Sequence, residues 1–219
     1  TGDTSGNIGA LTATAITGLD MGGSIAYATV ETLNIALGSA NDDFTIDSTH
    51  ANVTNLSTNG GTDVITVQTT AGITTVNGDA DADTINVQTI SAATTINGGA
   101  ANDTINVGSN AQQGSVGDQN NNSGGIIDGI GAVLTVNGGD AAANDDGLNI
   151  DDTGDTNVNV GTLTAATITG LDMGGSIVYG AIENLTIGLG SGADDFTVSS
   201  TASNTDTLVN AGSGDDTVK

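Results

Sequence analysis

Short runs in which apolar and polar residues alternate recur along the whole chain. Typical runs are 65-ITV-67, 85-INV-87 and 105-INV-107, and each is soon interrupted by Gly, Asn, Asp or Ser. A two-residue period places successive side chains on opposite faces, as in a β-strand. The abundance of Gly, Thr, Val, Ile and Asn disfavours helices. The pattern therefore predicts an all-β protein made of short strands.

These runs return at a nearly constant spacing. The apolar residue after each acidic loop recurs at steps of 21, 20, 20, 21 and 22 residues, at Phe44, Ile65, Ile85, Ile105, Ile126 and Leu148. Because each segment resembles the next, the pattern favours stacked parallel coils over a sandwich of hairpins. We predict a parallel β-solenoid, of the β-helix or β-roll type, with coils of about 20–22 residues. Apolar side chains would fill its interior, with Thr and Asn outside.

One row of residues is expected to form a ladder in such a stack. Four asparagines precede a glycine at the same place in the repeat, namely Asn59, Asn77, Asn97 and Asn137. Stacked amide side chains of this kind hydrogen-bond to one another. The row supports the solenoid over the sandwich.

A longer repeat is superimposed on the short one. Residues 9–46 and 161–198 are nearly identical at an offset of 152 residues, and both contain TGLDMGGSI. We interpret 1–219 as a single continuous solenoid with about one and a half copies of this unit, residues 9–66 being equivalent to 161–219. We expect it to be a window of a longer tandem array. The polar stretch 117–131 is expected to protrude as a loop.

The charge of the chain is extreme. It carries 26 acidic residues against one basic residue, for a formal net charge of −25, and only two of the acids are Glu. Nucleic acid is excluded as a partner, because phosphate binding needs Lys or Arg. Thiol chemistry is excluded by the absence of Cys. Membrane insertion is not expected, because the sequence has no apolar run of the length of a membrane span.

The aspartates gather in the loops that precede the strands. These loops share the form G-x-[G/A]-x-D-x-apolar, as in 99-GAANDTI-105 and 212-GSGDDTV-218, while 78-GDADADTI-85 is richer in acids. Stacked loops bring like charges within about 5 Å of one another, and bound cations would reverse that repulsion. The alternative is that these residues only form turns. The candidate metal ligands are Asp42, Asp43, Asp63, Asp79, Asp81, Asp83, Asn102, Asp103, Asp145, Asp146, Asp194, Asp195, Asp215 and Asp216.

These loops resemble the glycine- and aspartate-rich nonapeptides of the repeats-in-toxin (hemolysin-type) family. The chain as a whole, including 30-VETL-33 and 182-IENL-185, is similar to giant bacterial exoproteins built from β-strand repeats. The resemblance implies Ca²⁺ bound between coils and a location outside the cell, secreted or on the cell surface. It also implies a structural role as a stalk, adhesin shaft or filament.

Other functions are less favoured by the sequence. We expect no enzyme: a β-helix polysaccharide-degrading enzyme is the rival, but an internal Arg or Lys is missing, and abundant Asp makes any carboxylate pair uninformative. A carbohydrate- or ice-binding adhesin module is a second alternative, suggested by the T-x-T pieces at 12–14 and 167–169. The expected partners are a second solenoid end, joined by end-to-end association or by covalent continuation, and a cell-surface glycan. We expect His50 to be a surface residue.

Overall fold

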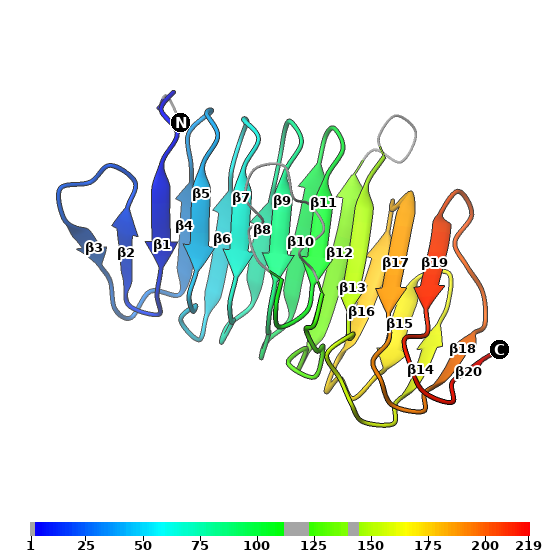
Figure 1. The fold of residues 1–219 in the computed structure, drawn as a ribbon. Coiled ribbons are helices and arrows are strands. Elements are labelled where there is room, and N and C mark those ends of the chain that lie inside the picture. Colours follow the sequence, from blue (N-terminus) through cyan, green and yellow to red (C-terminus); the bar gives the residue numbers. More distant parts are fainter. Residues whose placement is uncertain (1–2, 112–122, 140–144) are drawn as a thin grey trace.

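The computed structural model describes residues 3–111, 123–139 and 145–219. These residues form two sheets of ten strands each and contain no helix. The strands of both sheets run side by side along one axis (Figure 1). The prediction of an all-β solenoid is confirmed.

The two sheets, sheet A and sheet B, take alternate strands of most of the chain. Sheet A has the spatial order β19 (Asp206–Asn210), β17 (Asn184–Gly188), β13 (Gly147–Asp151), β11 (Thr104–Val107), β9 (Thr84–Val87), β7 (Val64–Val67), β5 (Asp43–Ile46), β1 (Ile8–Leu11), β2 (Ala15–Gly18) and β3 (Ser24–Ala26). Sheet B has the order β20 (Thr217–Val218), β18 (Asp195–Val198), β14 (Val160–Leu163), β15 (Thr167–Gly170), β16 (Ser176–Gly180), β12 (Val133–Gly139), β10 (Thr94–Gly99), β8 (Thr74–Asn77), β6 (Val53–Ser57) and β4 (Thr32–Ala36).

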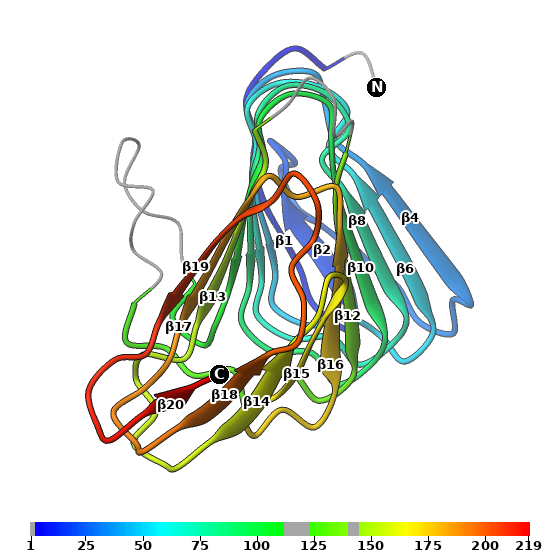
Figure 2. The ribbon, with the colours of Figure 1, turned by 90° about the vertical axis from the view of Figure 1, so that its right-hand side faces the viewer.

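Each coil contributes one strand to each sheet, and equivalent strands pair in parallel. Between β9 and β11, for example, Ile85 lies opposite Ile105 and Val87 opposite Val107. The 20-residue period of the sequence is therefore the register of the sheet. The chain passes from sheet B to sheet A at one edge, the upper edge in Figure 2, and returns at the opposite, lower edge.

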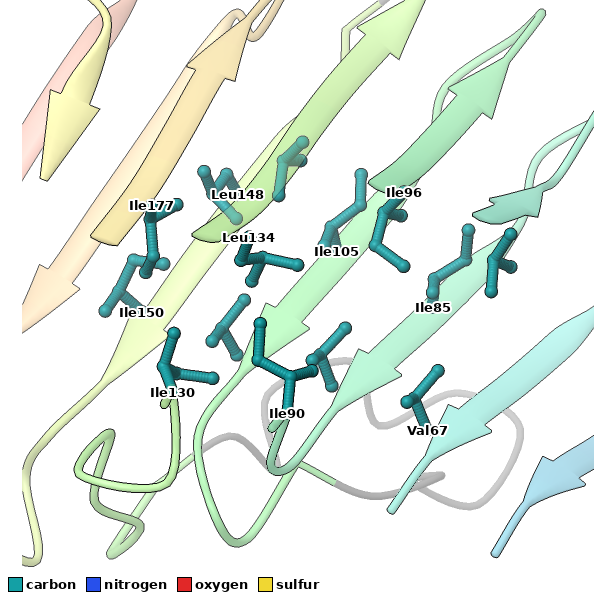
Figure 3. Close-up of a cluster of buried hydrophobic side chains, with 14 of the residues drawn as sticks. Val67, Ile85, Ile90, Ile96, Ile105, Ile130, Leu134, Leu148, Ile150 and Ile177 are labelled. Carbon is teal, nitrogen blue, oxygen red and sulfur yellow. The ribbon is translucent and has the colours of Figure 1, made fainter. Parts of the chain in front are cut away.

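The core is a narrow column of aliphatic side chains between the two sheets. Ile85, Ile105 and Leu148 from sheet A face Ile96 and Leu134 from sheet B, and all are fully buried (Figure 3). One or two aliphatic side chains per strand fill the gap, as the low aromatic content predicts. The exceptions are Phe44 and Phe196, the largest fully buried side chains.

One predicted coil is absent. Ile126 was expected to begin a strand, but the neighbour of Ile105 in the stack is Leu148, 43 residues later. Instead, the described part of the intervening segment, residues 123–132, buries Ile127 and Ile130 beneath the solenoid, and Ile130 forms a single bridge with Ile90. Of the stretch 117–131 that was predicted to protrude, residues 117–122 lie outside the described residues, while 123–131 do not simply protrude, because Ile127 and Ile130 are fully buried.

The long repeat inserts an antiparallel hairpin that the sequence analysis did not predict. In the first copy β1, β2 and β3 pair in sequence within sheet A, and in the second copy β14, β15 and β16 do so within sheet B. The same sequence thus lies in opposite sheets. One repeat advances the solenoid by an odd number of half-coils, so successive hairpins face opposite sides.

Glycine is required on the first strand of each hairpin, at Gly9 and Gly161. A Cβ at Gly9 would lie 2.6 Å from the side chain of Leu19 and 2.8 Å from that of Phe44. The equivalent Gly161 has the same contacts, with Leu171 and Phe196. The phenyl ring occupies the space that a side chain on β1 or β14 would need.

Candidate metal centre

The inner aspartate of each upper-edge loop joins one coil to the next. These residues are Asp42, Asp63, Asp83, Asp103 and Asp146, here called the upper ladder. Each carboxylate accepts a hydrogen bond through Oδ1 from the backbone N–H of the preceding member: 2.6 Å from Asp42 to Asp63, 2.8 Å from Asp63 to Asp83, 2.9 Å from Asp83 to Asp103 and 2.8 Å from Asp103 to Asp146.

Both ends of the upper ladder continue with other residues. The N–H of Asn7 donates to Asp42 (2.7 Å), and the N–H of Asp146 donates to Oε2 of Glu183 (3.0 Å). On the lower edge a shorter series repeats the arrangement, because the N–H of Asn159 donates to Asp194 (2.8 Å) and that of Asp194 to Asp216 (3.0 Å). The two copies of the repeat therefore place their ladders on opposite edges.

The second carboxylate oxygen of most ladder aspartates has no partner; in the upper ladder the exception is Asp42, whose Oδ2 accepts the N–H of Gly38 (3.2 Å). Within the described residues, Oδ2 of Asp63, Asp83, Asp103, Asp146 and Asp194 is buried without a hydrogen bond. An ionised carboxylate in such a position is costly unless a proton or a cation compensates it. The buried Oδ2 atoms of the ladder therefore need a proton or a cation to neutralise the carboxylate charge.

The glycine after each ladder asparagine makes room for this carboxylate. A Cβ on Gly98 would lie 2.4 Å from Oδ2 of Asp103 and 2.4 Å from the carbonyl oxygen of Gly138. Gly78 and Asp83 repeat the arrangement, at 2.5 Å. The φ angles of these two glycines are not positive. The Asn-Gly pair thus serves close packing between coils and not only turn geometry.

Burial raises the pKa of the ladder carboxyls. The pKa of Asp83 rises to about 8, and those of Asp63 and Asp103 to about 6, chiefly through loss of hydration. Neighbouring ladder carboxylates add to the rise, while the backbone hydrogen bonds oppose it. Burial also raises the pKa of Asp146.

The remaining predicted ligands lie outside the ladder and mostly bind other parts of the protein. Asp79 and Asp81 are exposed and accept hydrogen bonds from the N–H groups of Asn59 and Gly61 (both 3.1 Å). Asp43 lies half-buried on β5, and Asp215 is exposed. The other contacts are Asn102 Oδ1 with the N–H of Asp145 (3.1 Å), Asp145 with the Asn184 amide (2.6 Å), and Asp195 with Lys219 (2.7 Å).

The structure does not gather the predicted ligands into a cluster of carboxylates. Within the described residues, the one group of three potential ligand side chains is Asp128, Asp152 and Asp155, whose ligand atoms lie within 4.8 Å of one another. Asp128 is exposed, while Asp152 and Asp155 are buried. These three residues are the candidate metal centre, and the sequence analysis named none of them.

Two chain segments build this centre on the lower edge. Asp128 belongs to the segment between β11 and β12, and Asp152 and Asp155 lie in the connection from β13 to β14. The N–H of Ile127 donates to Asp152 Oδ1 (3.1 Å), which holds the two segments together. The amide of Asn159 donates to Oδ2 of Asp155 (2.8 Å) and of Asp152 (3.4 Å).

The electrostatics of the centre favour a cation. Burial raises the pKa of Asp152 to about 7, and the carboxylates of Asp155, Asp128 and Asp194 add to the rise. Burial and the same kind of charge repulsion raise the pKa of Asp128. Burial also acts on Asp155, but hydrogen bonds from Asn157 and Asn159 outweigh it and lower that pKa.

The donor set consists only of oxygen atoms. Carboxylates in a group of this kind suit a hard divalent cation such as Ca²⁺ or Mg²⁺. Oδ1 of Asn159 adds a further oxygen beside the group, since it is buried without a hydrogen bond. The cluster could therefore hold a metal ion.

The first copy of the repeat contains part of the same arrangement. Asn7 donates to Asp3 Oδ2 (3.0 Å), as Asn159 does to Asp155, and Oδ1 of Asn7 is likewise buried without a partner. The shared signal in the sequence is D-x-x-x-N, at 3–7 and 155–159. The contribution of Asp128 could not be found in this way, because it is 24 residues from Asp152 and depends on how the intervening segment folds.

Two other sequence expectations can be compared with the structure. His50 is half-buried, not at the surface: its ring packs edge-on against Tyr27 with 5.8 Å between ring centres, and Nδ1 contacts the Thr54 hydroxyl at 3.2 Å. The asparagine ladder is confirmed for Asn77, Asn97 and Asn137, whose amides bond in series at 2.8 Å. Asn59 does not join it, since its amide donates to the carbonyl of Leu37.

Comparison with known proteins found no match for this chain. The chain matches no protein-family model, no curated protein and no solved structure. The described residues include no helix of the length and apolar character needed to cross a membrane.

Proposed function

We propose that the protein is an extracellular structural repeat protein, a Ca²⁺-stabilised β-solenoid that forms part of a surface stalk, an adhesin shaft or a filament. The observation that carries this proposal is the cluster of Asp128, Asp152 and Asp155. A cation bound there would cross-link the segment before β12 to the connection before β14. It would secure the point at which the hairpin is inserted into the stack.

The regularity of the solenoid supports a mechanical role. In-register parallel strands, the asparagine ladder and the aspartate ladder all bond one coil to the next along the axis. Load along the axis would be shared by many hydrogen bonds, as expected of a shaft.

Calcium is favoured over magnesium by the irregular oxygen ligands. Ca²⁺ accepts varied geometry and protein oxygens, including carbonyls and amides, whereas Mg²⁺ requires near-octahedral geometry and retains water. Extracellular calcium would also compensate part of the charge of −25, which a single basic residue cannot do.

An ice- or carbohydrate-binding face has less support. The residues in one row across sheet A, on the side away from the core, are Thr45, Thr66, Asn86, Asn106 and Asn149, of which Asn86 and Asn106 are buried. This row changes from Thr to Asn along the stack, and the amides of Asn86, Asn106 and Asn149 hydrogen-bond to one another. An ice-binding face needs Thr hydroxyls at the same position on consecutive coils. This row does not provide them.

Thermal melting tests the proposal. Circular dichroism of the wild-type chain is recorded in calcium, in magnesium and with a chelator. We expect calcium to raise the melting temperature by about 10 °C, since a ligand at a hundredfold excess over its Kd stabilises by about 2.7 kcal/mol. Equal melting temperatures in calcium and chelator would overturn the calcium role.

A further inference from the structure

The N-terminal face of the solenoid, formed by β3 and β4, exposes residues that the second copy of the repeat buries. Ile25 is 52% exposed, whereas its equivalent Ile177 is fully buried. Leu33 is half-buried, whereas its equivalent Leu185 is 1% exposed. The compared residues are of the same type in both copies, so the difference in their exposure comes from the neighbouring coil.

In the second copy a neighbouring coil covers these positions. β16 pairs in parallel with β12, placing Ile177 opposite Leu134, and β17 pairs with β13, placing Leu185 opposite Leu148. Within the described residues, no strand pairs with the corresponding edges of β3 and β4, which end their sheets in Figure 1. The contact of β16 and β17 with β12 and β13 therefore shows, within this chain, how a coil can cover the N-terminal face.

The opposite end of the solenoid presents a coil of the required kind. β19 and β20 end the two sheets there. Their connection, 209-VNAGSGDDTV-218, has the same order of features as the segment from β12 to β13, which begins 136-VNGG-139 and ends 146-DGL-148. Val218 is 49% exposed, although its equivalent Ile65 is fully buried by the next coil.

Glutamate has a defined role at the covered interface. Glu183 accepts the N–H of Asp146 through its side chain (3.0 Å), and its own N–H donates to the Asp146 carbonyl (3.1 Å). Glu31 is equivalent to Glu183, and these are the only two glutamates in the chain. Glu31 is exposed at the N-terminal face.

The edges and sheets of the two ends correspond. The chain passes from β3 in sheet A to β4 in sheet B at the lower edge, so Glu31 lies on that edge. It also passes from β19 in sheet A to β20 in sheet B at the lower edge, where Asp216 is the last member of its ladder. Stacked copies would continue sheet A into sheet A without rotation.

We infer that a second copy of this chain stacks its β3–β4 coil on the β19–β20 coil of the first. Ile25 and Leu33 of one copy cover Thr207 and Val218 of the other, and Glu31 accepts the N–H of Asp216. The two surfaces differ, so the contact is head-to-tail and repeats along a fibre. This inference rests on the proposed structural role, and it names the surfaces through which copies of the chain would assemble.

Two substitutions disable one end each. Ile25→Asp places a charge in the N-terminal face and leaves the C-terminal face intact, and Val218→Asp does the reverse. Both residues are about half exposed in the single chain, so both variants should fold. Ile73→Asp is the matched control, because Ile73 is 57% exposed but lies between β7 and β8, away from both ends.

Sedimentation velocity over a concentration series reads the association. We expect wild type and Ile73→Asp to form species that grow with concentration, and each end variant alone to remain monomeric. An equimolar mixture of the two end variants should form dimers and nothing larger, because it holds one intact pair of ends. Circular dichroism of each variant confirms that it is folded.

Three results would overturn the inference: a monomeric wild type, growth by either end variant alone, or a mixture that remains monomeric. If an end variant alone still formed larger species, the contact surfaces named here would be wrong, but a filament role would remain possible through other surfaces. The melting experiment in calcium is independent of all three results.

As a finer test, Glu31→Leu should weaken association about tenfold, the effect of losing one charge-assisted hydrogen bond.

Discussion

The two copies of the long repeat differ in surroundings and hardly in sequence. Residues 17–25 and 169–177 are identical, yet the first set lies in sheet A, which ends at β3, and the second lies in sheet B, where β16 pairs with β12. Both form the same strands, turns and hairpin. Local sequence therefore determines the elements, and the coil below determines the sheet that receives them and the extent of their burial.

The largest expected effect comes from one substitution made at both equivalent positions. Ile177→Asp buries an unpaired charge in the core and should destabilise the fold by about 4 kcal/mol or more. Ile25→Asp should cost less than about 1 kcal/mol, because its side chain is half exposed. Urea unfolding of dilute monomer measures both. Similar losses would mean that the two copies have the same surroundings.

The second prediction concerns the pH dependence of the cation-free protein. The folded pKa values of Asp63, Asp83 and Asp103, at about 6 to 8, exceed the ordinary value of 3.8. The folded state thus binds more protons over that range, so its stability is greatest near pH 4 and falls as the pH rises through about 6 to 8. We expect a loss of about 3 kcal/mol, or about 10 °C in melting temperature.

Asp83→Asn serves as the matched variant for this prediction. The amide keeps the Oδ1 acceptor and carries no charge, so it should fold and show a smaller dependence on pH. Melting curves from pH 4 to pH 8 with a chelator measure the effect. Rising stability across this range would contradict the buried state of the ladder.

The third prediction uses a pair of equivalent glycines. A Cβ on Gly175 would lie 2.0 Å from the carbonyl oxygen of Ala132, whereas a Cβ on Gly23 would have nothing within 4 Å. Gly175→Ala should therefore cost about 2 kcal/mol and Gly23→Ala almost nothing. Gly23→Ala should nevertheless impair self-association, because a stacked copy would place backbone at the same spot. Unfolding curves and sedimentation together separate the two effects.

Much of the fold follows from short-range patterns in the sequence. The period of about 20 residues gives the parallel register, and the alternation around Ile85 and Ile105 gives the inward face. The position of Ile126 was predicted wrongly because it continues the spacing without forming a strand. The hairpin at β14 and β15 was missed because its T-x-T and Gly pattern is equally compatible with another coil.

The site was less accessible to sequence reasoning than the fold. Spacing identified the inner aspartates that form the ladder, but could not show that Oδ1 would be bonded to the next coil and Oδ2 left unpaired. The cluster around Asp152 brings together residues from both sides of β12. Its assembly depends on tertiary contacts. The only sign of them in the sequence is the D-x-x-x-N motif at 155–159.

The most direct test of the calcium-stabilised solenoid is calcium binding measured by isothermal titration calorimetry. Wild type is compared with Asp152→Asn, and with Asp20→Asn as a control at an exposed aspartate outside the cluster. The account predicts saturable binding by wild type and the control, and an affinity at least about tenfold lower for Asp152→Asn. Unchanged binding in Asp152→Asn, or none in wild type, would contradict it.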